Sequence, residues 1–126
     1  IAARFRFSSG LYEERMLAIR SAPEWEGQWR RLLARQGNPS PPPAVDFTRD
    51  MLLMAAMGPQ RSGGYSVSIE RVLDQPETLF VLVRMISPGP GCGAIAALTS
   101  PVDIVRIAAS PKPVRWVIER EAKDCR

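Results

Sequence analysis

The sequence predicts an α+β domain of mainly antiparallel β structure, a sandwich or curled sheet of six to seven short strands with one packed N-terminal helix. Short segments of alternating or continuous apolar character recur between turn-forming residues, as in all-β and mixed domains. A single segment, about residues 22–36, carries both the period and the end signals of a helix. The length of 126 residues fits one domain, and 45% hydrophobic residues are enough for one core.

Two short strands are expected before the helix. Arg4 to Ser8 alternates charged and aromatic side chains, which is the period of a strand. Glu14 to Arg20 is interpreted as a second strand. The N-terminal part of the chain therefore contributes β structure as well as the helix.

The helix has recognisable start, stop and face signals. Ser21 and Glu24 have the spacing of a capping box, and a proline in the first turn does no harm there. Gly37 suits the position that follows the last turn. One apolar stripe consists of Trp25, Trp29, Leu32 and Leu33. The stripe predicts core packing against a sheet, with a ligand platform as the alternative.

A proline-rich connector, residues 38–45, follows the helix. It carries four prolines and has neither a helix nor a strand ladder to make. A short linker is favoured over a recognition motif for proline-binding domains. Met51 to Met57 is then a continuous apolar run of strand length, although Met, Leu and Ala also suit a helix. We interpret it as a buried central strand.

The next two strands form the clearest pair. Tyr65 to Val72 alternates between apolar and polar residues, and Leu79 to Ile86 is dense in β-branched and apolar residues. Asp74 to Glu77 makes the connection between them. The two strands are therefore expected to pair antiparallel.

The last two strands are expected over Val102 to Ala108 and Val114 to Arg120. Ser110 to Pro113 joins them, and we expect neighbouring strands to form hairpins throughout the domain. The charged tail from Glu121 onward is predicted to be frayed, because chain ends with few apolar residues seldom pack.

Two glycine-rich loops, Gly58–Gly64 and Ser87–Gly93, border the antiparallel pair. Rigid loops on a sheet are frequent binding surfaces, whereas the simpler interpretation is tight turns that need positive φ. Gly63 and Gly64 match no phosphate-binding loop, because a strand follows them and not a helix. The candidate binding residues are Arg61, Gly63, Gly64, Tyr65, Pro88, Gly89, Pro90, Gly91 and Cys92.

Composition argues against several kinds of function. The chain has no histidine, which removes the commonest general base and metal ligand, so no metal, cofactor or catalytic residue is assigned. The 17 basic residues are spread thinly against 13 acidic ones, so no nucleic-acid interface is expected. No segment approaches the roughly 18 consecutive apolar residues of a membrane span. We expect a protein that is not an enzyme.

The two cysteines, Cys92 and Cys125, leave two states open. They can form one disulfide in an oxidising compartment, or remain two unpaired thiols. Cys92 is the one conceivable nucleophile, and the sequence provides no obvious base to activate it.

From about Asp46 onward, the sequence resembles the PrcB C-terminal domain family. The resemblance rests on Gly63-Gly64-Tyr65-Ser66-Val67 and Pro88-Gly89-Pro90-Gly91-Cys92, in that order and spacing, followed by Leu98-Thr99-Ser100-Pro101. It implies a single domain over residues 1–126. Residues 46–120 match best, residues 1–37 supply strands and the helix, and residues 38–45 are the connector.

The resemblance also implies a function and a location. The family takes its name from a subunit that associates with and stabilises a secreted subtilisin-like protease. We therefore expect a noncatalytic module that binds a protein, with a protease as the candidate partner. The expected location is outside the cytoplasm, in the periplasm or cell envelope, with the signal removed and lipid anchoring left open.

A second resemblance supplies the alternative function. Protease inhibitors of the chagasin family present three loops from one end of an immunoglobulin-like sandwich. Gly64-Tyr65, Pro88–Gly93 and, more faintly, Pro113–Trp116 are similar to those loops. This alternative requires that all three segments lie at the same end of the domain.

Overall fold

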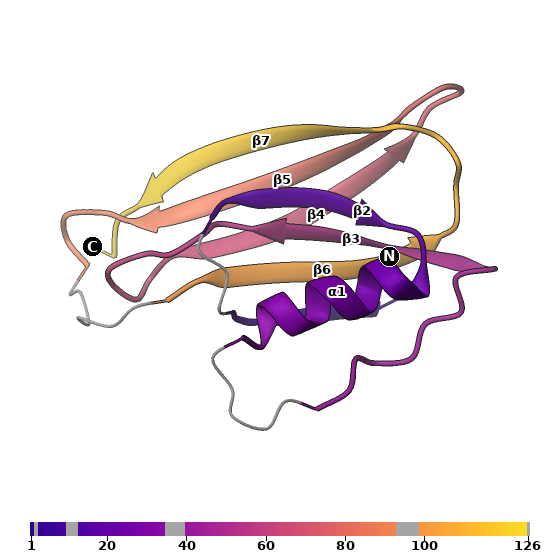
Figure 1. Ribbon diagram of the computed structural model, residues 1–126. Coiled ribbons are helices and arrows are strands. Elements are labelled where there is room, and N and C mark those ends of the chain that lie inside the picture. Colours follow the sequence, from indigo (N-terminus) through magenta and orange to yellow (C-terminus); the bar gives the residue numbers. More distant parts are fainter. Residues whose placement is uncertain (2, 10–12, 35–39, 93–98, 126) are drawn as a thin grey trace.

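A computed structural model describes residues 1, 3–9, 13–34, 40–92 and 99–125 (Figure 1). Within these ranges the chain forms seven strands and one helix, which confirms the expected α+β class. The elements are β1 (Ala3–Ser8), β2 (Arg15–Ile19), α1 (Ala22–Leu32), β3 (Asp50–Ala56), β4 (Ser66–Asp74), β5 (Leu79–Pro88), β6 (Pro101–Ala108) and β7 (Val114–Lys123).

The strands form two stacked sheets, and α1 covers the outer face of one of them (Figure 1). The large sheet has the order β1-β6-β3-β2, and each neighbouring pair in it is antiparallel. The small sheet has the order β4-β5-β7, in which β4 and β5 are antiparallel and β5 and β7 are parallel. The molecule therefore has three layers: the small sheet, the large sheet and α1.

An apolar core lies in each of the two spaces between the layers. Strand β3 contributes to both, because successive side chains of a strand point to opposite faces. Its odd-numbered residues from 51 to 55 pack against the small sheet, and its even-numbered residues from 52 to 56 pack toward α1. All six are buried, which explains the continuous apolar run. The predicted buried central strand is confirmed.

Helix α1 begins and packs as its sequence predicts. Ser21 is the N-cap: its Oγ accepts from the Glu24 backbone N–H (3.3 Å) and donates to Glu24 Oε1 (3.0 Å). Trp25 is 2% exposed, and the half-buried Trp29 lies 5.3 Å from it between ring centroids. The helix ends at Leu32, before the expected residue 36. Residues 35–36 and Gly37 lie outside the described residues.

The two indoles fix the proline-rich connector. Trp25 Nε1 donates to the carbonyl of Pro43 (2.9 Å), and Trp29 Nε1 donates to the carbonyl of Ser40 (2.8 Å). Residues 40–45 form neither helix nor strand, as expected. Proline has no N–H but keeps its carbonyl, so such a segment can still accept hydrogen bonds from its neighbours. The described part of the connector therefore lies along α1.

Two expectations about the C-terminal strands are wrong. β6 and β7 do not form a hairpin, because the chain passes from the large sheet to the small sheet between them. There β7 pairs with β5 in parallel, from Leu79 opposite Val114 to Pro88 opposite Lys123. The tail is not frayed, since β7 continues to Lys123 and Cys125 is held in a disulfide.

One buried carboxylate joins the two sheets. Asp103 of β6 is fully buried, and its Oδ2 accepts from the Ile69 N–H (2.7 Å), where a bulge interrupts the β4–β5 register. The Nε atoms of Arg4 and Arg6 lie 3.4 Å from Asp103 Oδ1. Arg4 also donates to the Ile69 carbonyl (2.6 Å), and Arg6 to Ser68 Oγ (2.6 Å). This cluster, named here the Asp103 cluster, links β1, β6 and β4.

The helix-side core can be tested at its two indoles. Trp25→Ala is expected to lower the free energy of unfolding by about 3–5 kcal/mol, because it removes a fully buried ring. Trp29→Ala should cost roughly half as much, because that ring is half-buried. Urea unfolding followed by circular dichroism measures both. Equal losses, or a loss below about 1 kcal/mol at Trp25, would contradict this packing.

The Asp103 cluster makes a separate prediction. Asp103→Ala should destabilise the domain by about 3 kcal/mol, because it leaves the buried Ile69 N–H without its acceptor and removes the carboxylate that faces the two arginines of β1. Asp103→Asn keeps an acceptor oxygen and should cost less. Asp50→Ala is the matched control: its pair with Arg106 spans 3.8 Å and is partly exposed, so about 0–1 kcal/mol is expected. A cost at Asp103 no larger than that of the control refutes the role of the cluster.

Candidate functional site

The two glycine-rich loops meet at one end of the sandwich, named here the loop end (residues 58–65 and 88–92; the left side of Figure 1). They emerge side by side because Ser66, the first residue of β4, pairs with Ile86 near the end of β5. The contact is close, since a Cβ added to Gly64 would lie 3.1 Å from Pro88 Cβ. The sequence therefore predicted both loops, and their adjacency follows from the β4–β5 hairpin.

The first loop is anchored to Thr99, two residues before β6. Gln60 and Thr99 form a backbone bridge, with N–H···O distances of 2.7 and 3.0 Å, and Thr99 Oγ1 donates to the Ser62 carbonyl (3.0 Å). Gly58 has φ +80°, and a Cβ there would lie 2.8 Å from the backbone N of Glu14. The backbone of this loop thus packs directly against the segment that precedes β2.

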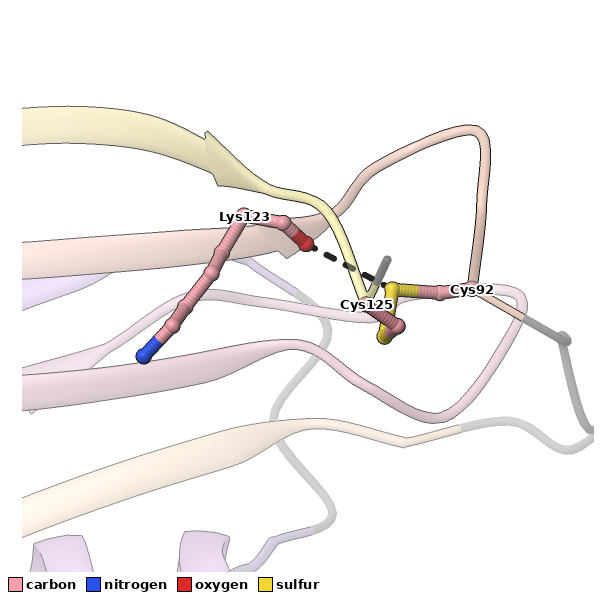
Figure 2. The surroundings of a disulfide bond; sticks show 3 residues. All are labelled: Cys92, Lys123 and Cys125. Atoms are coloured by element: carbon pink, nitrogen blue, oxygen red, sulfur yellow. Dashed lines mark hydrogen bonds between the residues drawn. A yellow bond between two sulfur atoms is a disulfide. The ribbon is translucent and has the colours of Figure 1, made fainter.

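The second loop is anchored to the end of β7 by a disulfide between Cys92 and Cys125, which are 33 residues apart (Figure 2). The Gly89 N–H donates to the Lys123 carbonyl (3.0 Å), and the Cys92 N–H donates to the Gly89 carbonyl (3.1 Å). A Cβ on Gly89 would lie 2.9 Å from Asp124 Cα, so the tail occupies the space of a side chain. Three kinds of contact therefore hold this loop.

The thiol states that the sequence left open are resolved by this bridge. Cys92 and Cys125 are joined, so the alternative of two unpaired thiols is wrong for this structure. Cys92 Sγ lies 3.4 Å from the Lys123 carbonyl, a close contact without a proton, because a disulfide sulfur is not a donor. In the bonded state Cys92 is not a thiolate and is not available as a nucleophile.

Tyr65 separates two open hollows at the loop end. The first, about 310 Å³, is lined by Tyr65, Met57 and Met85 and by residues 120–122 of β7. The second, about 320 Å³, is lined mainly by apolar atoms and includes Val67 and Val102. Both are at the small end of the roughly 300–1,000 Å³ of ligand pockets, and both open to solvent. Neither hollow encloses its contents.

Each hollow is bordered by an arginine that is held in place. Arg120, beside the first hollow, donates through Nη2 to both carboxylate oxygens of Glu14 (2.9 and 3.0 Å), and its Nη1 lies 3.3 Å from Met85 Sδ. Arg6, beside the second hollow, belongs to the Asp103 cluster. Neither arginine could be assigned to the site from the sequence, because both come from strands far from the loops along the chain.

The nine predicted site residues all lie at the loop end, but they differ in role. Arg61, Gly64 and Pro90 are exposed, whereas Gly89 is buried. A positive φ explains why glycine stands at position 64 (+90°), as predicted, and at position 58. Gly89 has no positive φ; glycine is needed there because the backbone of Asp124 lies too close for a side chain. Gly93, the expected end of the second loop, lies outside the described residues.

The third segment of the inhibitor hypothesis lies elsewhere. Pro113 accepts from the Leu79 N–H (3.0 Å), so Pro113–Trp116 begins β7 beside the start of β5. The second loop follows the other end of β5, which is ten residues long and spans about 30 Å at about 3.3 Å per residue. The three segments therefore do not form one surface.

Comparison with protein families gives a match to part of the chain. The family model PrcB C-terminal matches residues 51–108, which run from β3 to the end of β6 and include the first loop and Pro88–Cys92. Comparison with curated proteins and with solved structures found no match. In the described ranges, no helix is long and apolar enough to cross a membrane.

Glycine-to-alanine substitutions in the first loop and in α1 are expected to change stability in opposite directions. Gly64→Ala should destabilise the domain by about 1–2 kcal/mol, because a non-glycine residue is strained at positive φ and Pro88 is close. Gly27→Ala in α1 meets open space and should stabilise by about 0.5–1 kcal/mol. Thermal and urea unfolding measure both changes. A loss of stability at Gly27, or none at Gly64, would be the contradicting result.

The disulfide should contribute measurably to stability. Closing a loop with this sequence separation is worth about 4 kcal/mol in the chain-entropy model. The double variant Cys92→Ser, Cys125→Ser should lose approximately that amount, and the wild-type protein should lose it in a reducing agent. The double variant itself is the control, because a reducing agent should not change its unfolding curve. Identical stability with and without the bridge would exclude this contribution.

Proposed function

We propose, from the match of residues 51–108 to the PrcB C-terminal family model, that the chain is a noncatalytic module whose loop end binds a partner protein. The proposed partner is a secreted subtilisin-like protease, which the module would hold and stabilise. The observation that carries the proposal is the double anchoring of the loop end: one loop is hydrogen-bonded to Thr99, just before β6, and the other is bonded to the end of β7 and to Cys125.

Rigid loops support binding for a physical reason. A loop that is ordered before association loses little conformational entropy when the partner arrives, so more of the contact energy remains as affinity. Here the Gln60–Thr99 bridge, the Cys92–Cys125 disulfide and the Gly64–Pro88 contact restrict both loops. Tyr65 then offers a ring with few rotatable bonds between two hollows that can receive partner side chains.

The disulfide supports the proposed location. Structural disulfides persist mainly in oxidising compartments, which include the bacterial periplasm and the cell surface. The bridge lies at the loop end itself, so the proposed binding surface would be fully assembled only after oxidation. We accordingly place the protein in the periplasm or cell envelope as part of the same proposal.

Site-specific crosslinking tests the surface. A photoreactive phenylalanine derivative at Tyr65 should crosslink to a protease in the native cells, because Tyr65 lies between the two hollows. The matched position is Glu77, which is exposed in the turn between β4 and β5 at the opposite end. Equal crosslinking at both positions, or none at Tyr65, contradicts a binding role for the loop end.

Protease assays with the purified proteins test the role. A stabilising subunit should leave the initial rate of peptide hydrolysis unchanged and lengthen the half-life of the protease. Tyr65→Ala should remove that protection, whereas Glu77→Ala should retain it. Inhibition of the initial rate would favour the inhibitor hypothesis instead, and turnover of a substrate by the module alone would refute a noncatalytic role.

A further inference from the structure

Strand β7 forms an open edge of the small sheet in the part of the chain that the structure describes. It pairs with β5 on one side only, over ten residues that contain neither a proline nor a bulge. Edge strands present unpaired N–H and C=O groups, and proteins usually shorten or interrupt such strands. A long regular edge is therefore a surface on which another strand can pair.

The backbone groups available on this edge can be assigned. Leu79 N–H bonds to the Pro113 carbonyl, and Gly89 N–H bonds to the Lys123 carbonyl, at the two ends of the parallel ladder. In such a ladder alternate residues turn both backbone groups to the neighbour. The odd-numbered residues of β7 therefore bond to β5, and its even-numbered residues direct N–H and C=O outward.

The outer face of β7 carries an exposed apolar side chain between opposite charges. Val117 is 41% exposed, and Ile1 is the other large apolar residue exposed in the described ranges. Arg115 and Glu119 lie two residues before and after Val117 and so share its face. Neither of these two charges has an ion pair within the described chain.

This pattern is complementary to itself. We propose that β7 pairs antiparallel with β7 of a second copy of this chain, on a two-fold axis at Val117. The axis places Val117 opposite its own copy, and Arg115 opposite Glu119 of the second chain twice. On the other face it places Trp116 opposite Ile118, an aromatic and β-branched pair of the kind that stabilises sheets.

The proposed pairing of the two β7 strands agrees with the directions of their free backbone groups. Residues opposite each other in this pairing are both even or both odd, so the outward-directed groups of one copy meet those of the other. A two-fold axis at Ile118 also satisfies the backbone, but it places Val117 against Glu119 and leaves the apolar side chain beside a charge. The Val117 axis therefore fits the side chains better.

The resulting dimer would be reversible. Pairing of one strand from each copy buries less than the roughly 800 Å² per partner of a standard interface, so the dimer should depend on concentration. The two loop ends would point in opposite directions, because the paired strands are antiparallel. The proposal rests on β7 alone and does not depend on the function of the loop end.

Charge exchange tests both the dimer and its register. Sedimentation velocity of the purified chain at low ionic strength should show a monomer–dimer equilibrium. Arg115→Glu places like charges opposite each other twice and should weaken dimerisation about tenfold; Glu119→Arg should do the same. An equimolar mixture of the two variants restores both opposite-charge pairs and should form a heterodimer as tightly as the wild type.

The control is Arg31→Glu, the same substitution on the exposed surface of α1, which should leave dimerisation unchanged. Both edge variants change exposed side chains, so melting temperatures close to the wild type should confirm that they fold. A wild-type protein that stays monomeric up to its solubility limit overturns the proposal. The proposal is also overturned if neither Arg115→Glu nor Glu119→Arg changes the dissociation constant of the dimer. It is overturned as well if the two variants together form a dimer no tighter than either forms alone.

Discussion

The Asp103 cluster is the interaction on which the relative position of the two sheets depends. A carboxylate without access to water is costly unless charges and hydrogen-bond donors surround it. Here one Oδ accepts from the Ile69 N–H across the sheets and the other faces two arginines of β1. These directional contacts fix one register of β4 over β6, which apolar packing alone specifies less strictly. Because Ile69 is three residues after Ser66, the same contacts also fix where β4 receives the first loop.

The elements that follow from local chemistry were predictable, and their partners were less so. The cap at Ser21, the stripe of Trp25 and Trp29, and the doubly covered β3 all follow from patterns within a few residues. The parallel pairing of β5 with β7 does not, because it joins segments about 35 positions apart in the printed sequence. Local alternation in Val114 to Arg120 indicated a strand but did not specify which neighbour would provide its hydrogen bonds.

The candidate site shows the same division. Two glycine-rich loops at the same end of a hairpin could be predicted from turn residues on either side of two strands. Their anchors could not, since Thr99, Glu14 and Asp124 contact the loops through the fold and not through the sequence. The end of β7, which holds the second loop, also lies beyond residues 51–108 that match the family model. The rigidity of the site therefore depends partly on residues outside the range that matches the family model.

The position of β7 in the sequence has a consequence for biogenesis. Proteins emerge from a ribosome or an export channel from the N-terminus onward, and β5 has no partner on one side until residues 114–123 have followed it. During that interval an apolar strand has an open edge, the condition in which nascent chains associate wrongly and require a chaperone. The Cys92–Cys125 bond requires a still longer chain, because it cannot form before residue 125 has emerged. Completion of the small sheet and closure of the covalent bond are thus the last events in the maturation of this part of the chain.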